Sequence, residues 1–167
     1  MQDIFPCQFT LENYLTIFQK TRVLKPLLNS LKMSAMAVVV GLIITVPTSY
    51  MIVKYKGKFH ALLKMLLMLP WTMPASVVAI NLINAFSQKS IFAFGNALIG
   101  GFYIIPIAYT ITSLPLLLNS NEIALQGLNQ NLEEASKSLG AGMAYTFTHV
   151  IIPNIAPGIL SAGVLIF

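Results

Sequence analysis

Charged residues are scarce in this chain of 167 residues. Only ten are Lys or Arg and five are Asp or Glu, which makes 9% charged, against roughly 25% in a typical soluble domain. The hydrophobic share is 56%, so the chain cannot cover a water-exposed globule with charge. It is also too apolar and too rich in aromatic residues to remain disordered. The composition therefore predicts a membrane protein.

Residues able to carry chemistry are also few. Cys7 is the single cysteine, which excludes a disulfide framework, and no base partner for it is evident. His60 and His149 are isolated, without the spacing of metal ligands. The Gly-Lys pair at 57–58 continues to Phe and not to Ser or Thr, so it does not begin a phosphate-binding loop. We predict no catalytic residue, no metal site and no cofactor bound by this chain.

The net charge of +5 lies beside the apolar runs. One group of basic residues spans 20–32 and another spans 54–64. Flanking charge of this kind orients spans in a bilayer, and too few polar residues remain to build a nucleic-acid groove. We predict lipid as a partner and no nucleic acid.

Four apolar runs predict an all-α, polytopic transmembrane helix bundle in the cell membrane. They cover about 34–53, 61–86, 94–118 and the residues from 154 to 167. The last run is too short for a hydrocarbon core about 30 Å thick, so we expect the fourth span to be cut short in this sequence.

The domain plan follows from these runs. Residues 1–33 are interpreted as an extracytoplasmic lead-in, and 34–167 as the membrane domain with a cytoplasmic loop at 119–153. The lysine-rich connection at 54–60 favours this orientation under the positive-inside rule. The basic group at 20–32 opposes it with equal charge, so charge alone favours it only slightly.

The second run contains two prolines that enclose a short polar and aromatic segment. Proline inside a spanning helix frees backbone groups that neighbours must satisfy, and a bent segment of this kind is able to line a pathway. Two asparagines follow at helical spacing, and hydrogen bonding to adjacent helices is their alternative role. The candidate pathway residues are Pro70, Trp71, Thr72, Pro74, Asn81 and Asn84.

The loop at 119–153 contains signals for a short helix over 132–139. Asn131 is predicted as its cap, with Glu134 reaching back in a capping box. Gly140 is predicted as its left-handed stop. One face carries Leu132, Ala135 and Leu139, and this face suits docking into a groove on another protein.

A second helical stretch is predicted over 143–150. Pro153 follows it and is predicted to occupy the first turn of the last span. The loop is thus expected to consist of a helix, a glycine corner and a second helix.

These residues resemble a known family pattern. Glu134-Ala135-Ser136, then Gly140, then Val150-x-Ile152-Pro153 resembles the EAA loop of binding-protein-dependent, type I ABC importer permeases. The chain departs from that pattern at the serine, the valine and the second isoleucine, all of which are small or conservative changes. The resemblance implies that the loop is cytoplasmic, which decides the orientation that charge left nearly tied.

The resemblance also implies a role and partners. The helix would couple the bundle to a separate ABC ATPase subunit, which binds the ATP, and an extracytoplasmic solute-binding protein and a second permease subunit or half would complete the transporter. The segment with paired prolines resembles permeases for iron(III), aminoethylphosphonate, thiamine or polyamines, and we favour iron(III) or aminoethylphosphonate. The residues implied in coupling are Leu132, Glu133, Glu134, Ala135, Ser136, Leu139, Gly140 and Pro153.

Two other classes of protein stay open from the residues. A membrane-embedded enzyme needs ionisable residues inside its spans, and Lys64 is the one candidate. A non-transporting membrane scaffold would use the loop only to bind a partner.

Overall fold

A computed structural model describes residue 18, residues 21–87 and residues 98–167. The helices are α2 (Thr21–Lys54), α3 (Lys58–Thr72), α4 (Ala75–Phe86), α5 (Ile104–Gln126), α6 (Gln130–Ser138), α7 (Met143–Tyr145), the π-helix η2 (Thr146–Ile151) and α8 (Ile152–Ile166). No strand occurs in these parts of the chain, which confirms the all-α prediction. Cys7 and residues 94–97 of the third predicted span lie outside the described residues.

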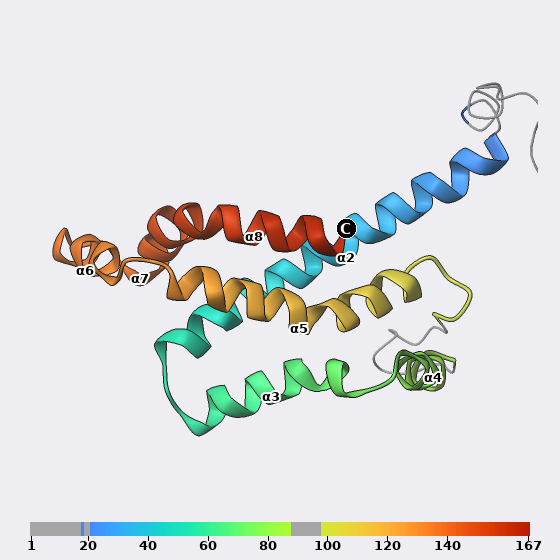
Figure 1. Ribbon diagram of the computed structural model, residues 1–167, viewed down its shortest axis with the longest axis horizontal. Helices are drawn as coiled ribbons and strands as arrows, with labels where there is room; N and C mark the ends of the chain where they lie inside the picture. The colour runs from blue at the N-terminus through green and yellow to red at the C-terminus, as the bar shows by residue number, and fades with distance from the viewer. Residues whose placement is uncertain (1–17, 19–20, 88–97) are drawn as a thin grey trace, which may run out of the picture.

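The long helices lie side by side, with α5 at the centre of the arrangement (Figure 1). It packs most extensively against α2, and then against α8 and α3. The short helices α6 and α7 lie at one end of the bundle, whereas α4 lies across the other end (Figure 1). The connection from α2 to α3 is at the same end as α6 (Figure 1), so the lysine-rich connection and the short helix α6 lie on one side.

Two helical stretches in the described residues are long and apolar enough to cross a membrane. They are Arg22–Lys54 and Met143–Ile166, and the bent pair α3 and α4 passes the same test only when its two helices are taken together as one broken span. The four predicted apolar runs correspond to α2, the α3–α4 pair, α5 and the stretch from α7 through α8. The chain is therefore a multi-pass membrane protein.

The first and last spans both begin earlier than predicted. Because α2 starts at Thr21, the predicted boundary between residues 33 and 34 lies inside a helix. The helical stretch that contains the last predicted span has 24 residues and begins at Met143, before the predicted start at 154. The π-helix η2 ends just before Pro153, which has no backbone N–H to donate to a carbonyl of the preceding turn.

The helix that corresponds to the third predicted span extends into the predicted loop. Residues 119–126 are part of the predicted cytoplasmic loop at 119–153, and α5 continues through them to Gln126. Two polar residues in this last part of α5, Asn121 and Glu122, are buried. Asn121 is fully buried, and its Nδ2 donates a hydrogen bond to Thr45 Oγ1 of α2 at 3.0 Å.

The second predicted span is broken at its prolines. Met73 is extended, with φ −102° and ψ 136°, as expected for a residue that precedes proline. The axes of α3 and α4 differ by 109° across this break. This confirms the predicted bend, but the run at 61–86 is two short helices and not one long span.

A close approach joins α5 and α8. A Cβ atom added to Gly158 would lie 2.6 Å from Ala124 Cβ, and Ala162, one turn further along α8, is buried. Small residues four apart permit this kind of contact between membrane helices.

We expect Gly158→Val to lower the free energy of unfolding by about 1–2 kcal/mol, because the added side chain overpacks the α5–α8 contact. The measurement is the thermal midpoint of the detergent-solubilised protein. Leu160→Val is the control on the same helix, since Leu160 is exposed. Equal midpoints for the two variants would contradict the packing.

Candidate functional site at the α6 corner

Helix α6 is capped by Asn129, the residue immediately before its first residue, Gln130. The side-chain Oδ1 of Asn129 accepts a hydrogen bond from the Asn131 backbone N–H at 3.0 Å. The prediction that Asn131 is the cap and Glu134 closes a capping box is therefore wrong. Asn129 offers the same side-chain chemistry two residues earlier, which moves the helix start to Gln130.

Helix α6 ends at a left-handed glycine, as predicted. Gly140 has φ +82°. Its N–H donates to the Lys137 carbonyl at 2.9 Å, and the Ala141 N–H donates to the Ser136 carbonyl at 3.1 Å. This pair of bonds is the Schellman arrangement. A Cβ at Gly140 would meet nothing within 4 Å, so glycine is required here by backbone conformation and not by lack of space.

The apolar stripe of α6, formed by Leu132, Ala135 and Leu139, faces away from the bundle. Leu132 is 40% exposed, Leu139 is 88% exposed, and Ala135 is exposed as well. A surface helix ordinarily turns its apolar side to its own core. Here the apolar side is left uncovered by the described residues.

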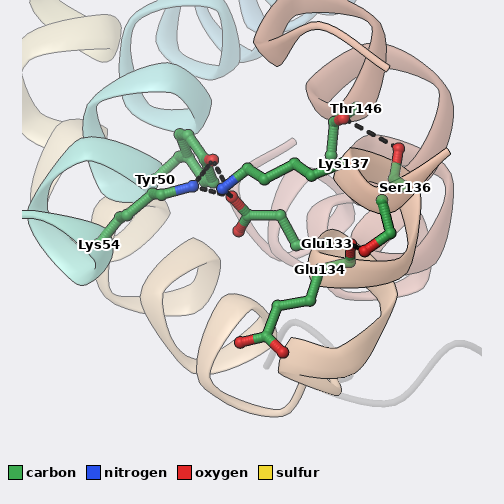
Figure 2. A network of polar contacts seen from close by, with 8 residues as sticks. Tyr50, Lys54, Glu133, Glu134, Ser136, Lys137 and Thr146 are labelled. Atoms are coloured by element: carbon green, nitrogen blue, oxygen red, sulfur yellow. Dashed lines mark hydrogen bonds and ion pairs between the residues drawn. The ribbon is translucent and has the colours of Figure 1, made fainter. Parts of the chain in front are cut away.

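The side of α6 that faces the bundle is polar. Glu133 forms an ion pair with Lys54 of α2, and Lys137 Nζ lies 2.8 Å from the same Glu133 Oε1. The Tyr50 hydroxyl donates to this oxygen at 3.2 Å. We call these four residues, Tyr50, Lys54, Glu133 and Lys137, the Glu133 network (Figure 2).

A second polar contact joins α6 to the π-helix. Ser136 and Thr146 are buried, and their hydroxyl oxygens are 2.9 Å apart. Glu134, the acid that matches the family pattern, is exposed and points away from the Glu133 network (Figure 2). Pro153 is exposed at the start of α8.

The candidate pathway residues are only partly brought together. Pro70 of α3 and Asn81 of α4 line the same cavity of about 290 Å³, which α5 closes with Ile111. The other four candidates are exposed and do not line this cavity: Trp71, Thr72, Pro74 and Asn84.

Sequence reasoning missed an ion pair between two spans. Lys64 Nζ of α3 lies 2.5 Å from Glu122 Oε2 of α5, and Glu122 is only 6% exposed. From the sequence, this acid belongs to the predicted loop at 119–153, and Lys64 is the one ionisable candidate within a span. No local signal pairs residues that lie 58 positions apart, although a polar residue just inside an apolar run is a hint.

The bundle and the corner together define an integral membrane component with a short helix on one side, whose apolar side is exposed. Residues 37–167 match the family described as "Binding-protein-dependent transport system inner membrane component". The chain belongs to this family, which comprises permeases of type I ABC importers in the inner membrane.

The names of related proteins agree with this family assignment. The chain is 34% identical over 162 residues to the "Probable ABC transporter permease protein y4fN" of Sinorhizobium fredii (strain NBRC 101917 / NGR234), which covers 96% of this chain and 28% of that protein. It is 29% identical over 144 residues to the "Molybdenum transport system permease protein ModB" of Escherichia coli (strain K12), and this alignment covers 83% of this chain and 63% of that protein. It is 27% identical over 143 residues to the "Molybdate/tungstate transport system permease protein WtpB" of Pyrococcus abyssi (strain GE5 / Orsay), and this alignment covers 86% of this chain and 54% of that protein. The chain thus spans less than two thirds of each of these relatives.

Proposed function

We propose that this chain forms solute-translocating spans of an ABC importer and that α6 docks on a separate ATPase subunit. The single observation that carries the proposal is the exposed apolar stripe of Leu132, Ala135 and Leu139 on a helix whose polar side faces the bundle. An uncovered stripe at this spacing is the surface that a helix-binding groove recognises. A solute-binding protein would approach the opposite end, and a second permease subunit or half would complete the pathway.

The chemistry of ATP belongs to the partner in this proposal. The chain contributes a helix that moves with the ATPase and a bundle with two arrangements. A ligand shifts such an equilibrium only by its differential affinity for the two states, and ATP would supply that difference through the ATPase. Beyond Gly140, the chain continues into the helical stretch from Met143 to Ile166, so a displacement of α6 reaches the last span.

We expect Leu139→Asp to weaken association with the ATPase subunit by about tenfold, which corresponds to 1.4 kcal/mol and is typical of an apolar contact at a protein interface. The fold should persist because Leu139 is 88% exposed. Co-purification and titration of the assembled transporter measure this affinity. Ser138→Asp places the same charge on α6 outside the stripe and should bind normally. Equal affinity of both variants would contradict docking through the stripe.

For the solute, we propose iron(III) or aminoethylphosphonate, on the resemblance of the segment at Pro70–Pro74. The second candidate is an oxyanion, because two relatives are named for molybdenum and for molybdate/tungstate. Uptake of radiolabelled iron(III), aminoethylphosphonate, molybdate, thiamine and spermidine by the reconstituted transporter decides among them. Uptake of none of these solutes, with a bound ATPase, would favour the scaffold.

A further inference from the structure

The Glu133 network connects the docking helix to a different span from the one that α6 reaches along the chain. Helix α6 has nine residues, and a helix of this length is marginal without tertiary contacts. Its backbone packs against the π-helix, which leads into α8. The ion pair of Glu133 with Lys54 instead reaches the end of α2.

We propose that Glu133 is a positioning residue, which through Lys54 and Tyr50 fixes the docking helix to the first span. A displacement of α6 is then passed to α2 through this network and to the last span through the Gly140 corner. This inference rests on the proposed function, because it assigns a second route for the motion that docking produces.

The contacts of the network suit the transfer of force. Two ammonium groups and one hydroxyl converge on a single carboxylate oxygen, and bonds between charged partners are about twice as strong as neutral ones. The side chains of Glu133 and Lys54 are only 19% and 22% exposed. Water therefore replaces the Glu133–Lys54 contact poorly when the helix is pulled, whereas the Lys137 side chain is 50% exposed.

The far end of the network is held by packing. Lys54 Nζ donates to the Tyr50 hydroxyl at 2.7 Å. The Tyr50 ring lies 5.0 Å from the ring of Phe147 in the π-helix and belongs to a core cluster with Leu125, Ile151 and Ile155. Tyr50 is thus fixed on α2 while its hydroxyl reaches α6.

The network and the docking stripe occupy different sides of α6, which makes the two roles separable. A change at Glu133 alters the link to α2 and leaves Leu132, Ala135 and Leu139 unchanged. The expected defect is therefore in coupling and not in association with the ATPase.

The test uses Glu133→Gln and Lys54→Met in the complete permease, assembled with its ATPase and binding protein in liposomes. We expect both variants to bind the ATPase normally, and we expect the assembled transporters to hydrolyse ATP. We expect solute moved per ATP hydrolysed to fall about tenfold, within the range of ordinary coupling between sites. An unchanged ratio in Glu133→Gln overturns the proposal, as does a loss of ATPase binding in that variant, which would place Glu133 in the docking surface.

Four further variants sharpen the result. The exchange Lys54→Glu with Glu133→Lys keeps two cations and one acid together and should restore the ratio. Lys54→Arg should retain it, and Lys56→Met is the matched control, because Lys56 is exposed in the same connection. If Glu133→Gln does not fold as a monodisperse protein, Tyr50→Phe removes only one hydroxyl and should still lower the ratio.

The two proposals fail differently. Normal ATPase binding by Leu139→Asp would contradict the docking proposal, whatever Glu133→Gln does. A normal transport ratio in Glu133→Gln would contradict only the second route through α2.

Discussion

Lys64→Met is expected to lower the free energy of unfolding by about 3 kcal/mol, the lower end of the range for breaking a buried ion pair from one side. The carboxylate of Glu122 would remain among apolar helices without its cation, because its Oε2 accepts from Lys64 Nζ and its Oε1 is buried with no partner in the described parts of the chain. The lower end applies because the Lys64 side chain is 40% exposed.

The measurement is equilibrium unfolding of the detergent-solubilised protein with increasing denaturant. Lys58→Met is the matched control, since Lys58 begins the same helix and is exposed. Lys64→Met combined with Glu122→Gln should recover most of the loss, because the pair is then replaced by neutral groups. A Lys64→Met protein as stable as the control would contradict a structural role for this pair.

The features predicted correctly depend on residues close together in the chain. The break at Met73–Pro74 follows from the steric restriction that proline places on its own helix and on the residue before it. The left-handed end of α6 follows from a glycine after the last residue of an amphipathic run. Both rules act within four or five residues, so a single sequence contains the information.

The features that were missed depend on partners far along the chain. The stretch at 119–122 is polar, which is typical of a loop, yet it is helical because Thr45 and Lys64 satisfy its side chains from α2 and α3. The sequence predicts that Glu133 lies in a short helix, but it does not predict its partner, Lys54, which lies on α2. Hydropathy alone gives no information about such pairs. The apolar run predicted from it therefore ends at about residue 118, whereas α5 continues to Gln126.

The α6 cap is an intermediate case. Asn129 and Asn131 have identical side chains, and both precede the apolar stripe. Propensity does not distinguish them. The structure selects Asn129, whose extended backbone at φ −69° and ψ 116° has the conformation that an N-cap requires.

Gly140→Val is expected to reduce transport on the order of a hundredfold while leaving the membrane bundle folded. At φ +82° a β-branched side chain is strained, and such strain costs up to about 3 kcal/mol. The corner has free space and lies at the surface, so the chain can relieve the strain by opening the Schellman turn. The docking arrangement then becomes a minor state. The apparent affinity for the ATPase falls in proportion to the fraction of molecules that still have the docking arrangement.

The matched control for this change is Gly142→Val. Gly142 also has nothing within 4 Å of an added Cβ, but its φ of −70° and ψ of 162° suit valine. Both variants are assayed for ATPase binding and for solute uptake, and thermal unfolding reports on the bundle. If backbone conformation at the corner positions the docking helix, only Gly140→Val loses binding and uptake together. Normal uptake by Gly140→Val would mean that α6 keeps its docking position without this turn, and the proposed coupling through the corner would then be wrong.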